Sequence, residues 1–228
     1  MFDIIQFHLL VSYAVILFLS GFCFSYRHDY KNFIKKKIDR LLIPYVCFGL
    51  LDAIPRILLT KFVNRPTEPE VIFHKLIFSG GEYWFLYVLF GIFIFYPFIF
   101  NAYEKNKKNV IFISAIIFTI ACCQITIYTF RVESILYHLV YFNAGYLVKL
   151  FFVKIRTMEI MKSKAIITLV PVTNVLLISV YLKIGYEFGK MEIIPVAFIG
   201  IFFSWLLTRI QFFNKFFAPY GKYSLQLY

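Results

Sequence analysis

The strongest constraint on the fold is that apolar runs of eighteen or more residues recur along the whole chain. A helix of that length crosses the roughly 30 Å hydrocarbon core of a bilayer, with its backbone polar groups paired inside the segment. Hydrophobic residues make up 61% of the sequence and charged residues only 16%, which excludes an ordinary soluble domain. The runs lack the two-residue alternation of barrel strands. The sequence therefore predicts an all-α, polytopic bundle of transmembrane helices.

The lengths of the apolar runs predict seven spans and the beginning of an eighth. The seven are Ile4–Tyr26, Leu41–Thr60, Trp84–Ala102, Val110–Phe130, Ser134–Val153, Ala165–Leu182 and Ile193–Phe213. The last eight residues, Gly221–Tyr228, read as the opening turns of another helix. Residues 1–228 are thus expected to form a single transmembrane domain, one that is incomplete at both ends.

The distribution of basic residues predicts how the chain is threaded. The connections after spans one, three, five and seven hold seventeen Lys and Arg, whereas the other connections hold six. Connections rich in Lys and Arg stay in the cytoplasm. We therefore predict a multi-pass protein of the cell (inner, cytoplasmic) membrane with Met1 on the extracytoplasmic side.

The net charge of +12 points to membrane lipids rather than to nucleic acid. Its Lys and Arg residues lie in short connections between spans instead of on one continuous face, and such connections contact anionic headgroups. The four cysteines lack the spacing of metal ligands, and no Gly-rich phosphate loop is readable. The sequence predicts no metal site and no bound cofactor.

Five short sequence pieces occur in an order that resembles the integral-membrane acyltransferase type 3 family. They are Leu19–Phe22, Lys37–Tyr45, Tyr83–Tyr87, Tyr141–Tyr146 and Gly221–Tyr228. The resemblance implies a larger bundle, acyl-CoA as the donor with acetyl as the acyl group, and a hydroxyl of a surface polysaccharide or glycolipid as the acceptor.

The resemblance also implies segments that have no counterpart in this sequence. The first span of the family, which carries a basic residue followed by a His, would precede Met1, and a last span would follow Tyr228. Two other interpretations stay open. One is a non-enzymatic transporter or flippase component for a lipid-linked glycan, whose polar residues would line a substrate path. The other is an inactive remnant that inserts into the membrane.

Acyl transfer to an alcohol requires a general base and a group that stabilises the developing oxyanion. Ionisable side chains inside spans are costly and are therefore candidates for function. Asp52 and Arg56 lie at i,i+4 on one face of the second span. Asp52 is a candidate catalytic residue and Arg56 a candidate substrate contact. The alternative is a mutually neutralised pair that locks helix packing.

Two histidines are further catalytic candidates. His138 lies one turn inside the fifth span and shares a helical face with Tyr141, a candidate substrate contact. His8 lies near the outer end of the first span. Placement of both histidines in an interfacial aromatic belt is the alternative.

The entry to the third span supplies two candidate substrate contacts. Glu82 and Trp84 follow Gly80-Gly81, and Trp at such a place is ordinarily an interfacial anchor. The resemblance favours a substrate contact there. By contrast, Arg131 and Glu133 occupy a short outer turn and are interpreted as a solvated charge pair.

The first basic connection has two interpretations. Its Lys and Arg side chains either set the topology and contact anionic lipids, or meet the phosphates of CoA. Arg40 and Lys37 are the candidate donor-binding residues. Arg40 is favoured because it lies at the membrane boundary beside Pro44.

Overall fold

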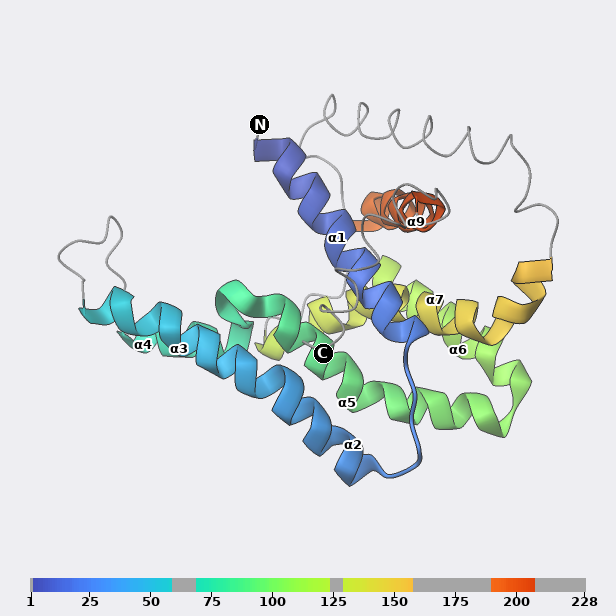
Figure 1. Ribbon diagram of the computed structural model, residues 1–228, viewed down its shortest axis with the longest axis horizontal. Helices are drawn as coiled ribbons and strands as arrows, with labels where there is room; N and C mark the ends of the chain where they lie inside the picture. Colours follow the sequence, from blue (N-terminus) through green and yellow to red (C-terminus); the bar gives the residue numbers. More distant parts are fainter. Residues whose placement is uncertain (1, 59–68, 124–128, 158–189, 208–228) are drawn as a thin grey trace. The chain divides into compact units, whose positions relative to one another are not determined.

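The computed structural model describes residues 2–58, 69–123, 129–157 and 190–207 (Figure 1). Within these ranges every regular element is a helix and no strand occurs, so the prediction of an all-α protein is confirmed. The chain divides into two compact units. The terminal unit comprises Met1–Phe24 and Val140–Tyr228, and the central unit comprises Ser25–Leu139.

The central unit is built on two long helical segments that pack antiparallel. The first joins α2 (Tyr30–Lys37), the π-helical turn η1 (Ile38–Leu42) and α3 (Ile43–Leu58), and the second is α5 (Trp84–Lys105). The Tyr30 hydroxyl donates to the Ile94 carbonyl at 3.2 Å, while the ring of Phe48 lies 5.9 Å from that of Tyr83. Earlier residues of the first segment therefore meet later residues of the second, so the two segments run antiparallel.

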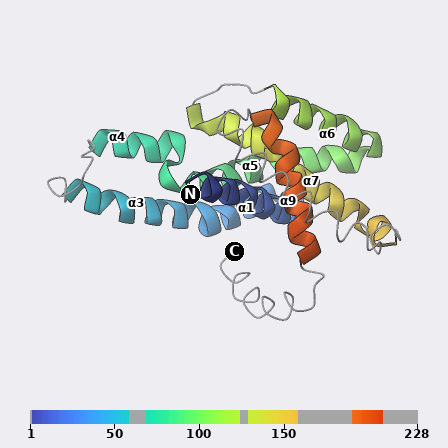
Figure 2. The same ribbon diagram turned by 90° about the horizontal axis from the view of Figure 1, so that it is seen from above.

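Shorter elements complete the central unit. Between the two long segments, α4 (Pro69–His74) and the π turn η2 (Lys75–Ser79) return beside α3, and η3 (Gly81–Tyr83) leads into α5 (Figures 1 and 2). The Tyr45 hydroxyl donates to the Leu76 carbonyl, which ties α3 to η2. Next come α6 (Lys107–Cys122), η4 (Thr129–Arg131) and α7 (Val132–Thr157), whose first turns belong to this unit.

Two helical segments in the described ranges are long and apolar enough to cross a membrane, Tyr30–Leu58 and Trp84–Lys105. Shorter apolar helices cover Ser12–Phe22, Lys108–Cys122 and Ile194–Ser204. Large apolar side chains are exposed along α3 and α6, including Leu51, Ile54, Leu58, Ile111 and Phe112. A surface of this kind suits contact with lipid better than contact with water.

The second predicted span begins earlier than the sequence suggested. Residues before Leu41 were expected to form a loop, but the helix starts at Tyr30. Asp29 caps it, since its Oδ1 accepts the Asn32 N–H at 3.1 Å, and lysines are good helix formers. Pro44 has no N–H to offer the Arg40 carbonyl, and the turn widens here, with the Ile43 N–H bonded to the Ile38 carbonyl.

Other predicted bounds also shift. The first helix, α1 (Phe2–Phe22), ends before the predicted Tyr26, and α6 ends at Cys122 rather than Phe130. The last described helix is α9 (Lys190–Leu207). The predicted span Ala165–Leu182 and the residues after Leu207 lie outside the described ranges.

The terminal unit contains α1, most of α7 and α9, and Figure 2 shows α9 crossing α1. At the contact between α1 and α7, Gly21 faces the backbone of Phe142, while Gly145 faces the backbone of Phe18. A Cβ atom on either glycine would overlap a carbonyl oxygen of the other helix. The two backbones are in direct contact, which only glycine permits. The Lys149 ammonium donates to the Phe24 carbonyl just beyond α1.

Candidate functional site

Two side chains from different elements lie against one indole ring at one end of the central unit. The His138 ring centroid lies 5.4 Å from that of Trp84, and the Arg131 guanidinium lies over the Trp84 ring at 5.6 Å from its centroid. We call Trp84, Arg131 and His138 the indole cluster. It joins a hydrogen-bonding imidazole, a cation and an aromatic ring, a combination suited to binding a polar substrate.

Left-handed turns bring these side chains together. Gly80 (φ 76°) and Gly81 (φ 50°) turn the chain from η2 into η3, so that Trp84 opens α5. Across from them, Phe130 (φ 55°) and Arg131 (φ 50°) adopt the same left-handed backbone without being glycine. Such residues cost about 1–3 kcal/mol each and persist only where their surroundings enforce them.

Aromatic packing holds Phe130 and Arg131 in this left-handed conformation. The Phe130 ring lies 5.1 Å from the ring of Phe78 in η2, and Phe78 in turn lies 4.7 Å from His74. These contacts hold η4 against η2. The strained turn therefore has a fixed partner, and the Arg131 side chain is directed to Trp84.

The hydrogen bonding of His138 defines its tautomer. Its Nδ1 lies 2.7 Å from the Ser134 carbonyl oxygen, one turn earlier in α7. A carbonyl oxygen only accepts, so Nδ1 carries the proton, and in the neutral ring Nε2 carries the lone pair. This arrangement is the one that a general base requires.

Asp52 and Arg56 form the pair expected from their spacing. Arg56 Nε donates to Asp52 Oδ1 at 3.2 Å, and Arg56 Nη2 lies 3.0 Å from Asp52 Oδ2. The fork is bidentate, the stronger geometry for such pairs. Both side chains remain partly exposed, at 35% for Asp52 and 46% for Arg56. The pair lies one turn beyond Phe48, which contacts Tyr83 at the entry to α5.

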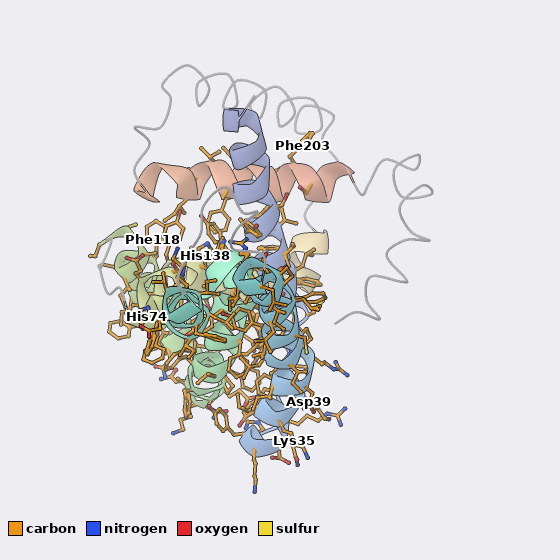
Figure 3. The ribbon with its side chains drawn as sticks, turned by 90° about the vertical axis from the view of Figure 1, so that its left-hand side faces the viewer. Lys35, Asp39, His74, Phe118, His138 and Phe203 are labelled. Carbon is orange, nitrogen blue, oxygen red and sulfur yellow. The ribbon has the colours of Figure 1, made fainter. Side chains whose placement is uncertain are left out.

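The candidate donor residues lie toward the other end of the central unit, which we call the basic end (Lys31, Lys35, Lys36 and Arg40). Figure 3 shows Lys35 and Asp39 projecting outward there, well apart from His138 and His74. Arg40 is also exposed. Lys37 differs, because its Nζ lies over the Phe93 ring at 3.7 Å from the centroid.

Contacts at the far end of α5 hold the segment that precedes α2. His28 Nε2 lies 3.1 Å from Glu104 Oε2, and the Tyr26 ring packs against Phe33 and Phe100. The predicted cytoplasmic connections after spans one and three thus meet at one end of the unit. The described parts of the predicted outer connections after spans two and four meet at the indole cluster.

The remaining candidates do not join the indole cluster. Tyr141 is buried in the terminal unit, where its ring lies 5.5 Å from Phe198 of α9. The backbone places His8 in α1 and Glu82 in η3, and their side chains lie outside what the structure describes.

Sequence reasoning missed Arg131 as part of the site. We interpreted it as one half of a solvated pair with Glu133 and did not foresee that its guanidinium lies over Trp84. The separation of 47 positions between the two residues gave no hint of the contact. The only available signal was that an Arg in an outer turn precedes a span that contains His138.

Comparison with known families decides the class of the protein. A family model for an acyltransferase domain matches residues 2–228. The chain belongs to the acyltransferase type 3 family. This family of acyltransferases is associated with membranes, in agreement with the two helical segments long enough to span one. Neither the curated proteins nor the solved structures contain a match to this chain.

Four of the five pieces that carry the acyltransferase resemblance fall in the described ranges, and each marks a special point of the backbone. Leu19–Phe22 and Tyr141–Tyr146 contain the two glycines of the α1–α7 contact. Lys37–Tyr45 contains the π turn η1, and Tyr83–Tyr87 contains Trp84. The acyltransferase pieces therefore coincide with close helix contacts, a widened turn and the indole cluster.

Proposed function

We propose that this protein transfers an acyl group, acetyl by family analogy, from acyl-CoA to a hydroxyl of a cell-surface polysaccharide or glycolipid. The seven-span threading with Met1 outside would place the indole cluster at the extracytoplasmic face and the basic end at the cytoplasm. The observation that carries the proposal is that His138 packs beside Trp84 with its Nδ1 bonded to the Ser134 carbonyl, in a member of an acyltransferase family.

In this proposal His138 is the general base. Its Nε2 takes the proton from the sugar hydroxyl while the hydroxyl oxygen forms a bond to the thioester carbonyl carbon. The carbon–sulfur bond then breaks, and CoA leaves as a thiolate that takes up the proton from His138. The products are the O-acyl sugar and free CoA, and no further reactant is needed.

The phosphates of the donor are assigned to Arg40, which is exposed within the π turn η1. A guanidinium suits this task because it forks to phosphate oxygens. Lys37 lies deeper, over Phe93, which is nine residues along α5 from Trp84. At 1.5 Å per residue the separation along the helix is about 14 Å. Lys37 thus lies partway between the basic end and the indole cluster, which shortens the path that the acyl group must travel.

The other candidates are assigned to the acceptor. Asp52 is a second candidate base, and Arg56 holds its carboxylate and contacts the sugar. Trp84 opens α5, and Glu82 lies in η3 just before it. Tyr141, a further candidate substrate contact, and His8, a further candidate base, belong to the terminal unit.

The proposal is tested by incubating membranes that contain the full chain with radiolabelled acetyl-CoA and surface glycan. We expect label in the glycan. We expect the H138Q variant to lose about 10²–10⁴-fold in rate, the usual contribution of a general base. The matched control is H74Q, because His74 is exposed at the same end and contacts Phe78 instead of Trp84.

Full transfer by H138Q would remove His138 from the chemistry. Absence of transfer by the unsubstituted chain would reject the enzymatic function. Movement of a lipid-linked sugar across the membrane without consumption of acetyl-CoA would assign the chain to transport instead.

A further inference from the structure

The two long helical segments of the central unit are offset along their length. The ring of Phe48 lies 5.9 Å from that of Tyr83, the last residue before α5, and the rings of Tyr45 and Tyr87 lie 5.8 Å apart. Beyond Phe48, α3 continues for ten residues, to Leu58. At 1.5 Å per residue it extends about 15 Å past the start of α5. Figure 1 shows α3 running on beyond the first turn of α5.

The extended part of α3 has a helical neighbour. α4 and η2 return beside it (Figures 1 and 2), and a Cβ atom on Gly49 would meet the tip of the Leu76 side chain. The left-handed turn at Gly80 and Gly81 then leads into η3 and α5. We call residues 49–58 and 69–79 the outer hairpin. Helix α5 therefore starts at the base of the outer hairpin and not at its tip.

Both arms of the outer hairpin expose large apolar side chains. Leu51 and Leu58 of α3 are 65% and 75% exposed, and Ile77 of η2 is 55% exposed. Val71 and Phe73 of α4 are exposed as well. Apolar surface of this extent is unfavourable in water and favourable in hydrocarbon. The described part of the connection between the second and third predicted spans is thus suited to lipid.

The length of the first segment indicates where the membrane lies. From Lys37 to Leu58 it runs through 21 residues, or about 32 Å, close to the roughly 30 Å of the hydrocarbon core. If Leu58 marks the outer boundary, the lysines of the basic end lie beyond the inner boundary, and Arg40 reaches the headgroups through its long side chain. The start of α5, about 15 Å below Leu58, then lies near the middle of the bilayer.

We propose that residues 69–83 form a re-entrant element, which contacts the acyl chains of the outer leaflet and holds the indole cluster near the middle of the bilayer. The indole cluster stays on the extracytoplasmic side of the basic end, but it lies beneath the membrane surface. Irregular backbone is tolerated at such a depth where protein buries it, and Gly80 in the turn is buried.

The ionisable side chains of the outer hairpin define its two sides. Such side chains inside a membrane pair with each other or face water. Asp52 and Arg56 pair, whereas Lys75 is exposed on the returning arm. Lys75 and Ile77 are two residues apart and therefore lie on nearly opposite sides of their helical turn. We infer that the side with Lys75 faces water and the side with Ile77 faces lipid. This step rests on the function proposed above, because a sugar needs a wet approach to a base inside the membrane.

The lipid contact is tested by quenching of a single tryptophan with brominated phospholipids. The chain contains two tryptophans, so a W84F/W205F background has none, and I77W and L58W each add one reporter. The full chain is placed in phosphatidylcholine vesicles that carry bromine either near the headgroup or near the end of the acyl chains. We expect deep bromine to quench I77W more strongly and shallow bromine to quench L58W more strongly. Absence of quenching of I77W, or a depth profile equal to that of L58W, would overturn the re-entrant placement.

A second experiment keeps both tryptophans and tests the wet side. The four native cysteines are replaced by alanine, and K75C and I77C are labelled in sealed vesicles with a charged maleimide that does not cross the membrane. The thiolate is the reactive form and lipid disfavours its charge, so K75C should react at least about ten-fold faster than I77C. Both thiols should react completely after denaturation in SDS.

Equally fast labelling of K75C and I77C would show that the outer hairpin lies in water, which contradicts the proposal. Equally slow labelling would refute the wet approach past Lys75. Neither experiment involves transfer of an acetyl group. A chain that fails both but acetylates the glycan would keep the proposed function and lose only this placement.

Discussion

The direct contact of α1 with α7 gives the sharpest test of the packing described above. A Cβ atom at Gly21 would coincide with the Phe142 carbonyl oxygen, and one at Gly145 would coincide with the Phe18 carbonyl oxygen. Both obstacles are backbone atoms, so no side-chain rotation relieves them. The G21A or G145A substitution must force the two helices apart.

The cost follows from overpacking. Forcing extra methyl groups into a packed contact costs about 1–3 kcal/mol, and backbone obstacles place these variants in the upper half of that range. For a chain of this size, 1 kcal/mol corresponds to about 2–4 °C in Tm. Each variant should therefore melt about 4–12 °C below the unsubstituted protein.

The double variant carries the more stringent expectation. Once one alanine has separated the helices, the second meets space that already exists. The sum of the two single losses of stability should therefore exceed the loss in the G21A/G145A double variant. The assay is thermal melting in detergent, followed by size-exclusion chromatography of a fluorescent fusion. G49A is the control, because a Cβ there meets only the tip of the Leu76 side chain. Single variants no less stable than G49A, or strict additivity in the double variant, would refute a direct backbone contact.

Two further predictions concern the ends of helices. Hydrogen bonds from Asn32, of which the one from its backbone N–H has the larger effect, hold the pKa of Asp29 below its usual value. In acid the unfolded chain therefore binds more protons than the folded one. The stability that Asp29 gives α2 is thus present above about pH 4 and is lost as the pH falls through the lower folded-state pKa. Melting curves should show a deficit of D29A at pH 6 that shrinks in acid, whereas a constant deficit would contradict the cap. In the terminal unit, K149M removes the donor to the Phe24 carbonyl and should lower Tm by about 2–4 °C. K149R keeps a donor and should melt near the unsubstituted protein, and equal losses in both variants would argue against the bond.

Much of the fold follows from the sequence because membrane segments obey simple rules. Runs of apolar residues predicted helices, and α1, α5, α7 and α9 lie where such runs were found. The antiparallel packing of α3 with α5 agrees with the alternation of basic connections. The pairing of Asp52 with Arg56 also followed from their spacing of four residues.

The start of the second helical segment and the contact between Trp84 and Arg131 were not predicted from the sequence. The charges of Lys35, Lys36 and Lys37 marked the segment before Leu41 as a connection, although lysine is a good helix former and Asp29 supplies a cap. At the site, the contact of Trp84 with Arg131 depends on left-handed conformations at Phe130 and Arg131. Hydrophobic patterning does not predict such conformations in residues other than glycine.

The widened turn at Ile38–Leu42 takes up one residue more than an ordinary α-helical turn within the segment that runs from Tyr30 to Leu58. Deleting one residue here and restoring α-helical winding would therefore leave the two flanking parts of the segment almost in phase. Lys37 would stay over the Phe93 ring. A deletion in ordinary α-helix elsewhere in the segment would instead turn one part against the other by about 100°. The segment should thus tolerate the loss of a residue at this place better than anywhere else along its length.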